Sequence, residues 1–245
     1  MGSNIKKRII TSIFLISLLT LMFFYSYIMI ISVIIISIIA WIEFYALISK
    51  IFKKNINQHK VLRFLCKAIS LLFLTILVYL IFIIETGHLN LKIYLLYSVL
   101  VAIMTDIGGL VFGKIFKGKK LTKISPNKTI SGSIGSLIFS ILLIPFYQES
   151  LFNESLSIIF IITITISITS QLGDLFISFL KRKAKVKDTS DIFPGHGGIL
   201  DRKDGIIFAI PVGIYLFTII SYEKNCNFWI NRFYWLFIIK YCKKR

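Results

Sequence analysis

The fold is decided by residues 9–49, which read IITSIFLISLLTLMFFYSYIMIISVIIISIIAWIEFYALIS. A membrane-spanning helix needs about 20 apolar residues, so this run is too long to cross a membrane once. We expect two spans, at 9–25 and 28–49, with the chain turning back around Tyr25–Tyr27. The stretch therefore predicts an integral membrane protein.

Similar apolar segments recur along the rest of the chain. They lie at 64–84, 93–113, 132–147, 156–180 and 206–221. A shorter aromatic segment at 228–239 carries Arg232, so it is either a poor span or a helix in the membrane interface. We predict an all-α, polytopic helical membrane protein with about 7–8 transmembrane helices, because alternating ten-residue strands do not occur.

The composition of the 245 residues supports a single membrane-embedded domain. The chain is 56% hydrophobic, with a mean hydropathy of +0.83, whereas soluble domains are about 45–50% apolar. We expect this domain at 1–221, with its motifs at 105–205, followed by an aromatic and basic tail at 222–245. The scattered Cys66, Cys226 and Cys242 predict neither a disulfide framework nor a zinc site.

Basic residues concentrate in alternate connections between the spans. Most of the 29 Lys and Arg precede the first span or follow the second, fourth and sixth. The intervening connections at 85–91 and 148–155 contain none and carry Glu85, Glu149 and Glu154. The positive-inside rule then predicts a cytoplasmic N-terminus. It also explains the net charge of +18, so we expect no nucleic-acid partner.

The aspartates and glycines share the last two cytoplasmic connections with these basic residues. The aspartates are Asp106, Asp174, Asp188, Asp191, Asp201 and Asp204. Most of the 14 glycines lie between 108 and 135 or between 173 and 205. Solubility requires neither bias, so together they predict a polar site at the cytoplasmic membrane face.

Asp174 lies inside a predicted span. An unpaired carboxylate at that depth costs ~2.5–3.5 kcal/mol and is functional by default, although it can also serve as a structural partner for a buried Lys or Thr. Polar residues recur around it every three or four positions, at Ser167, Gln171, Asp174, Ser178 and Lys181. This spacing predicts a polar stripe on one helix face, turned toward protein or water.

The connection at 181–205 adds carboxylates, bases and glycines. Asp201 and Asp204 would point the same way if a helix begins there. Converging carboxylates suit Mg²⁺, neighbouring Lys and Arg suit phosphate oxygens, and glycines let the backbone approach a ligand. No P-loop or GxSxG nucleophile elbow occurs. The combination favours metal-assisted phosphoryl or nucleotidyl transfer.

Residues 178–204 read SFLKRKAKVKDTSDIFPGHGGILDRKD. This segment closely resembles the signature of the CDP-diglyceride synthetases, also called phosphatidate cytidylyltransferases. TDIGGLVFGKIF and KISPNKTISGSIGS, within 105–136, and SQLGDLFISFLKR at 170–182 agree with the same family. The resemblance extends over roughly residues 6–221 in order and layout.

The resemblance implies an enzyme that makes CDP-diacylglycerol and pyrophosphate from CTP and phosphatidate. It also implies Mg²⁺, with room for a second cation, a homodimer, and contact with anionic lipid. The high Ile and Lys content suggests a bacterial source, so we expect a multi-pass protein of the bacterial cell (inner) membrane.

Site residues are carried over position by position. Asp174 and Asp201 are the expected metal ligands and Asp204 a close supporter. The catalytic candidates are these three aspartates with Arg202 and His196. The substrate-binding candidates are Ser125, Lys128, Lys181, Arg182, Lys187, Gly197 and Gly198.

The sequence departs from the family pattern at a few positions. Lys203 replaces an apolar residue, Gly205 stands where Ser is common, and Ser131 stands where an acid is common. We expect Lys203, between Asp201 and Asp204, to perturb metal affinity.

Three other functions compete with this interpretation. A CDP-alcohol phosphotransferase would need an Asp-Gly-x-x-Ala-Arg string, which is missing. A CTP-using polyprenol kinase would share the chemistry without explaining the whole signature. A cation carrier would use Asp106 and Asp174 as intramembrane sites and needs a polar route to the outer face.

Overall fold

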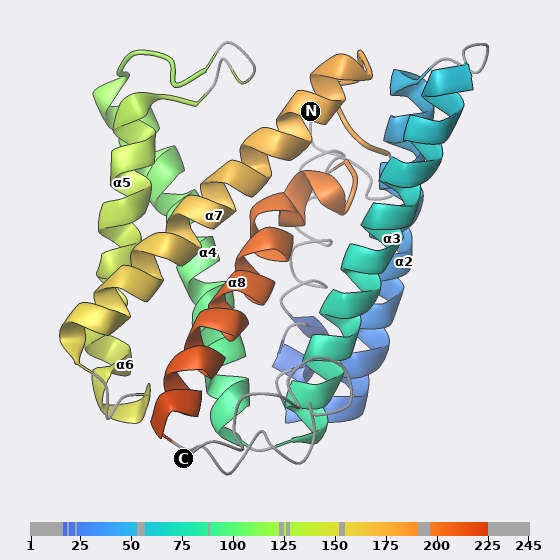
Figure 1. Ribbon diagram of the computed structural model, residues 1–245. Helices are drawn as coiled ribbons and strands as arrows, with labels where there is room; N and C mark the ends of the chain where they lie inside the picture. Colours follow the sequence, from blue (N-terminus) through green and yellow to red (C-terminus); the bar gives the residue numbers. More distant parts are fainter. Residues whose placement is uncertain are drawn as a thin grey trace, which may run out of the picture.

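The computed structural model describes residues 17–18, 20–22, 24–52, 57–87, 89–122, 125, 128–151, 155–190 and 197–224. Its helices are α2 (Ser26–Ile51), α3 (Asn57–Thr86), α4 (Leu89–Phe116), α5 (Ile130–Ile141), α6 (Ile144–Leu151), α7 (Leu156–Lys183) and α8 (Leu200–Lys224), shown in Figure 1. Within these ranges β-structure is limited to isolated bridges such as Lys120–Thr129. The predicted all-α class is confirmed.

Among the described residues, five helical segments are long and apolar enough to cross a membrane. They are Ser26–Ile51, His59–Thr86, Lys92–Phe116, Ile130–Tyr147 and Leu156–Lys183. Asp204–Ile219 is a shorter apolar helix. These segments confirm a polytopic helical membrane protein and match the predicted spans from 28–49 to 206–221. Most of the predicted span 9–25, all of 228–239 and nearly all of the tail 222–245 lie outside the described residues, so the full span count and the domain division stay predictions.

The structure refines three predicted boundaries. A helix boundary lies within the turn expected around Tyr25–Tyr27, because α2 begins at Ser26 with Tyr25 at its N-cap, although most of the span before it lies outside the described residues. The span at 132–147 consists of two helices, with a turn at Leu142 and Leu143 between α5 and α6. Helix α8 begins at Leu200, ahead of the predicted 206, so Asp201 lies in its first turn. The helical start that would align Asp201 with Asp204 is therefore present.

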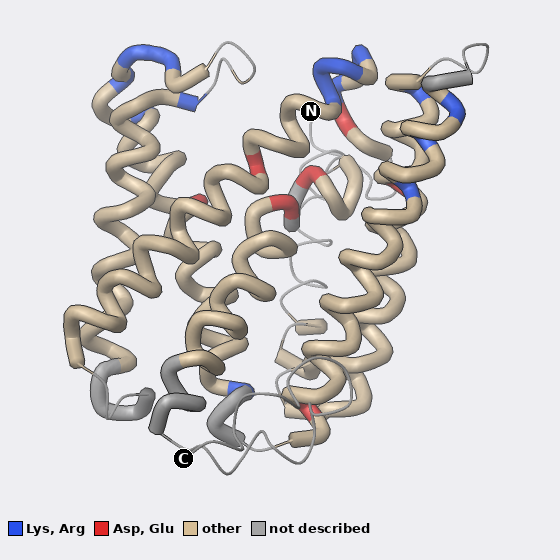
Figure 2. Tube along the Cα trace, viewed as in Figure 1, with Lys and Arg blue, Asp and Glu red and all other residues tan. Residues whose placement is uncertain are grey.

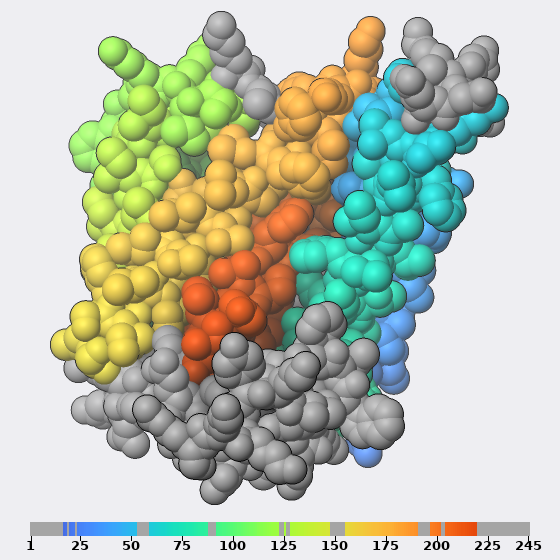
Figure 3. Space-filling model, in the orientation of Figure 1, coloured from blue at the N-terminus to red at the C-terminus, as the bar shows by residue number. Residues whose placement is uncertain are grey.

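Helices α2 and α3 pack side by side as a hairpin beside a body formed by α4, α5, α7 and α8. In the space-filling view α8 lies between α7 and α3, with its side chains against both (Figure 3). Tyr97, Val101, Ile166 and Phe217 form a buried core in the body. The N-terminal end of α8 lies deeper in the bundle than the neighbouring end of α7 (Figure 1). This recessed helix end brings the first turn of α8 to the level of α7's polar stripe.

Glycines allow α4 and α5 to pack almost backbone to backbone. A Cβ atom at Gly108 would lie 2.6 Å from the Gly135 carbonyl oxygen, and one at Gly132 would lie 2.8 Å from the Gly109 carbonyl oxygen. A Cβ at Gly135 would collide with the ring of Phe112. The glycine bias between 108 and 135 therefore serves close helix packing, which holds the two walls of the site together.

We expect Gly135→Val to destabilise the protein by about 1–3 kcal/mol, because the added methyl groups overpack the α4–α5 contact. The matched control is Ile134→Val at the neighbouring position, whose side chain is 54% exposed and faces away from that contact. Thermal unfolding in detergent measures both variants. Equal unfolding temperatures for Gly135→Val and wild type would contradict the packing described for α4 and α5.

Most of the described Lys and Arg residues gather at one end of the bundle, where α2, α4 and α7 end and α3 begins (Figure 2). At the opposite end, Lys92 pairs with Glu85, with 2.6 Å between Nζ and Oε1. This distribution agrees with the predicted alternation of basic connections. The recessed start of α8 lies toward the basic end.

Candidate active site

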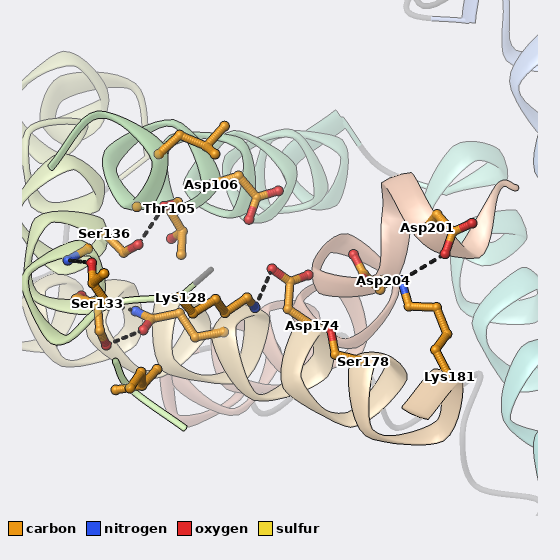
Figure 4. A pocket seen from close by; sticks show the side chains of 16 residues that line it. Thr105, Asp106, Lys128, Ser133, Ser136, Asp174, Ser178, Lys181, Asp201 and Asp204 are labelled. Atoms are coloured by element: carbon orange, nitrogen blue, oxygen red, sulfur yellow. Dashed lines mark hydrogen bonds and ion pairs between the residues drawn. The ribbon is translucent and has the colours of Figure 1, made fainter. Parts of the chain in front are cut away.

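A cavity of about 370 Å³ lies between α4, α5, α7 and the first turn of α8 (Figure 4). Its polar lining consists of Thr105, Asp106, Lys128, Thr129, Ser133, Ser136, Gln171, Asp174, Ser178, Lys181, Asp201 and Asp204. Five of the predicted site residues are among them: Asp174, Asp201, Asp204, Lys128 and Lys181. The structure therefore brings segments that are far apart in sequence to one polar cavity.

Lys128 reaches the cavity from the connection between α4 and α5. Backbone hydrogen bonds fold this connection back on itself: Leu121 N–H donates to the Lys128 carbonyl at 2.8 Å, and Ile130 N–H to the Lys119 carbonyl at 2.9 Å. The Lys128 ammonium then lies 2.9 Å from Asp174 Oδ2. An ammonium held beside a carboxylate at the cavity wall is also placed to bind a phosphate oxygen.

The polar stripe predicted on α7 faces the protein interior. Ser167 Oγ accepts from Thr105 at 2.8 Å, and Gln171 Oε1 accepts from Ser133 at 2.5 Å. Asp174, Ser178 and Lys181 continue the stripe along the cavity. This prediction is confirmed, and the two hydroxyl partners on α4 and α5 explain why these polar groups are tolerated at membrane depth.

Asp174 and Asp204 lie next to each other, on α7 and α8 (Figure 4). Small residues permit this approach, since a Cβ at Gly205 would lie 2.5 Å from Ser170 Oγ and 3.1 Å from Asp174 Oδ1. Asp106 projects into the same cavity from α4. Gly205, the departure from the family's usual Ser, is thus a contact point between α7 and α8.

The Asp174 and Asp204 carboxyls fit a Mg²⁺ ion. Asp174 Oδ1 is buried and has no hydrogen-bond partner among the described residues. Mg²⁺ is commonly held by one or two carboxylates together with waters and substrate phosphates. The described residues contain no cluster of three or more His, Cys, Asp or Glu arranged around one ion. The donor set therefore suits an ion shared with a phosphate ligand.

Asp201 accepts more hydrogen bonds than Asp174 or Asp204. Its Oδ1 accepts from Lys181 Nζ at 2.8 Å, and its Oδ2 accepts from the N–H groups of Thr189 at 2.8 Å and Gly198 at 3.1 Å. Burial alone would raise the pKa of the Asp201 carboxyl, but these donors outweigh it and hold the pKa below its usual range. Asp201 is therefore ionised at neutral pH and fixes the position of Lys181.

The remaining predicted residues lie around the cavity or outside the described part. Ser125 forms the turn before Lys128, to which its carbonyl is bonded at 3.1 Å. Arg182 and Lys187 are exposed at the basic end. Gly197 has φ +80, in the left-handed region. The backbones of Arg202 and Lys203 lie in the first turn of α8, but their side chains, and all of His196, lie outside the described structure.

Gly198 packs against the side chains of Thr189 and Glu43. A Cβ there would collide with Thr189 Oγ1 and would lie 2.6 Å from both carboxylate oxygens of Glu43. The absence of a side chain at this position makes room for those groups. Whether Gly197 and Gly198 also contact a substrate stays a prediction.

Glu43 is a residue that the sequence analysis missed. It is 2% exposed, lies in α2, and accepts hydrogen bonds from Thr189, Ser190 and the first N–H groups around the start of α8. A signal was present, because Glu43 is the sole charged residue of the apolar run 9–49. A carboxylate at membrane depth is costly and is expected to have a functional or structural role. This rule identified Asp174, and it applies equally to Glu43.

Comparison with known proteins places this site in a family. Residues 3–220 match the family model described as "Cytidylyltransferase family". The chain belongs to the cytidylyltransferase family. The match covers all of α2–α8 except the last turn of α8, so the cavity and every residue that lines it fall inside the family region.

Individual members of the cytidylyltransferase family share substantial identity with the chain. A phosphatidate cytidylyltransferase of Staphylococcus haemolyticus (strain JCSC1435) is 47% identical over 124 residues, which are 49% of this chain and 46% of that protein. One of Rickettsia bellii (strain RML369-C) is 39% identical over 161 residues, which are 60% and 69% of the two chains. The chain thus spans about half the length of the staphylococcal relatives it matches.

Proposed function

We propose that this protein transfers CMP from CTP to phosphatidate, giving CDP-diacylglycerol and pyrophosphate. The observation that carries the proposal is the meeting of Asp174, Asp204, Lys128 and Lys181 in one cavity at the basic end of the bundle. Relatives named phosphatidate cytidylyltransferase support the same reaction. By the positive-inside rule that end is cytoplasmic, where CTP is found. The membrane is then the bacterial inner membrane.

The bond changes define what the site must do. An oxygen of the phosphatidate phosphate attacks the α-phosphorus of CTP and forms the new P–O bond. The bond between the α-phosphorus and the bridging oxygen to the β-phosphate breaks, and pyrophosphate leaves with the electron pair. No covalent enzyme intermediate is required, so catalysis consists mainly of positioning and charge stabilisation.

The cavity supplies groups that can position the phosphates and groups that can stabilise their charge. Lys128 and Lys181 place ammonium groups at its wall, each held by a carboxylate at 2.9 Å and 2.8 Å respectively, and these donors would bind the phosphate oxygens of CTP or phosphatidate. A Mg²⁺ held by Asp174 and Asp204 would supply further charge neutralisation for the phosphates. Asp201 remains a predicted ligand, although its hydrogen bonds give it a role in fixing Lys181.

Partners beyond the substrates belong to the same proposal. The homodimer and the second cation rest on the family resemblance, and the basic end suits anionic lipid at about 1 kcal/mol per charge near the surface. Light scattering on the detergent-solubilised protein tests the dimer.

The cation-carrier alternative is less well supported. Polar side chains do continue past the cavity between α4 and α7, as Tyr97 Oη lies 2.6 Å from Thr163 Oγ1 and Thr105 bonds Ser167 at 2.8 Å. These four residues are at most 1% exposed. They satisfy one another as helix-packing contacts, which favours nucleotidyl transfer over an ion path.

The proposal is tested by incubating the purified protein in lipid nanodiscs with CTP, phosphatidate and Mg²⁺ and detecting CDP-diacylglycerol by mass spectrometry. We expect product that depends on all three additions. A folded protein that yields no CDP-lipid would overturn the proposed function.

Lys128→Met is expected to lower kcat/KM for CTP about tenfold to hundredfold, because one charge-assisted phosphate contact is lost. Lys119→Met is the matched control, since Lys119 lies in the same connection with an exposed side chain. Steady-state rates at saturating phosphatidate measure both. Equal losses in the two variants would mean that Lys128 acts only through the general charge of the connection.

A further inference from the structure

Glu43 connects the α2–α3 hairpin to the start of α8. Its Oε1 accepts from Ser190 Oγ at 2.5 Å and Ile199 N–H at 3.0 Å. Its Oε2 accepts from Thr189 Oγ1 at 2.9 Å and Leu200 N–H at 2.9 Å. Both oxygens of this buried carboxylate are therefore fully used, and all four donors come from 189–200, some 150 residues away along the chain.

The recessed position of α8 explains why a carboxylate is needed there. The first N–H groups of a helix have no partner within the helix, and a helix N-terminus that is sunk into a bundle cannot give them to water. Glu43 accepts two of these N–H groups, and its negative charge lies at the favourable end of the helix dipole. This accounts for the carboxylate as a cap, but a cap does not require the contact with Thr189.

Thr189 joins Glu43 to the cavity. Its hydroxyl lies 2.9 Å from Glu43 Oε2 and 3.0 Å from Asp201 Oδ2, and its N–H donates to the same Asp201 oxygen at 2.8 Å. Asp201 in turn holds the Lys181 ammonium at 2.8 Å. Because the Thr189 hydroxyl carries a single proton, that proton is shared between the Glu43 and Asp201 oxygens. These contacts form one continuous path from α2, through the 184–190 connection and α8, to a cationic group of the cavity wall on α7.

We propose that Glu43 is a positioning residue for the transfer reaction, which holds Asp201 and Lys181 in place through the Thr189 hydroxyl. The inference rests on the proposed function, because Lys181 matters only if the cavity binds phosphate. Glu43 itself does not line the cavity, so its effect on turnover is transmitted through Thr189.

Variants at Thr189 separate positioning from capping. Thr189→Val removes the hydroxyl while keeping the shape and the N–H bond to Asp201, and it leaves the Glu43 bonds to Ile199 and Leu200 untouched. Thr189→Ser keeps the hydroxyl. Each Glu43 oxygen accepts one backbone N–H, from Ile199 or from Leu200. In Glu43→Gln the amide NH₂ therefore faces one of these two N–H groups in either orientation, and that hydrogen bond is lost.

The control is Glu85→Gln, which alters a buried carboxylate far from the cavity. Its side chain is 0% exposed and paired with Lys92 at the opposite end of the bundle. It has no contact with the cavity, so it reports what a buried charge contributes to stability alone.

The experiment measures kcat/KM for CTP, the CTP-induced shift in unfolding temperature without phosphatidate, and the unfolding temperature itself. We expect Thr189→Val and Glu43→Gln each to lower kcat/KM about tenfold or more, and Glu43→Gln to add less than about twofold in the Thr189→Val background. Thr189→Ser should remain within about threefold of wild type. Glu85→Gln should lower the unfolding temperature and leave kcat/KM unchanged.

Three results would overturn the inference: full activity of Thr189→Val, equal losses in Thr189→Ser and Thr189→Val, or multiplicative losses in the double variant. If Glu43→Gln fails to fold, the comparison of Thr189→Val with Thr189→Ser still tests the inference. Failure of the proposed function is a separate outcome, since wild type would then make no CDP-lipid under any condition.

Discussion

Replacing Asp174 by Asn is expected to reduce the rate of CDP-diacylglycerol formation by about 10³-fold or more, because it removes a charge at the centre of the proposed metal and phosphate site. Asp174 is the point at which α7, α8 and the 117–129 connection meet: its Oδ2 binds Lys128 at 2.9 Å, and its Oδ1 is buried without a partner among the described residues. No other described carboxylate combines an ion pair with an unpaired buried oxygen in this cavity.

The measurement compares turnover with the rise in unfolding temperature that Mg²⁺ produces in the absence of CTP. Asp174→Asn should lose both, and Asp204→Asn should weaken both. Asp188→Asn is the matched control, since Asp188 is exposed in the nearby 184–190 connection and should retain both. Wild-type activity in Asp174→Asn would remove Asp174 from the site.

Asp201→Asn is expected to lower kcat/KM for CTP about 10²-fold or more and to destabilise the protein, because the neutral amide leaves Lys181 without its ion pair and turns an NH₂ group toward existing donors. The pKa of the Asp201 carboxyl is held below its usual range, so the carboxylate stabilises the fold above the unfolded-state pKa. That stability is lost as the pH falls through the lower, folded-state pKa.

Unfolding temperatures of wild type and Asp201→Asn across acidic pH measure this contribution. The difference between the two proteins should be constant near neutral pH and shrink in strong acid. A difference that grows on acidification would contradict the hydrogen-bonded, ionised Asp201 described above. Asp188→Asn again serves as the control.

The helices and the α7 stripe could be predicted because the membrane imposes strong rules on sequence. Apolar length fixes the spans, and the spacing from Ser167 to Lys181 fixes the polar face, whatever the helix packs against. The aspartates and the family motifs also located the site region. Boundaries were less well determined: the residues that form the α5–α6 turn, Leu142 and Leu143, are as apolar as their neighbours.

The pairings within the site could not be predicted from periodicity. Lys128 and Asp174 are 46 positions apart, and Glu43 and Leu200 are 157 apart. Which groups meet depends on the tilt of α7 and the recessed start of α8, and these follow from packing at Gly173 and Gly205, where Phe208 and Ser170 fill the space a side chain would need. Glu43 was missed for the same reason, since its partners lie in a distant segment.

Transfer of the CMP part of CTP to the lipid is the step that defines the proposed reaction. It is tested most directly by supplying CTP labelled at the α-phosphate in one reaction and at the γ-phosphate in another, with phosphatidate and Mg²⁺, and separating lipid from water-soluble products. We expect the α-label to enter the lipid and the γ-label to leave as pyrophosphate. Entry of the γ-label into lipid would show phosphoryl transfer and contradict the proposed reaction.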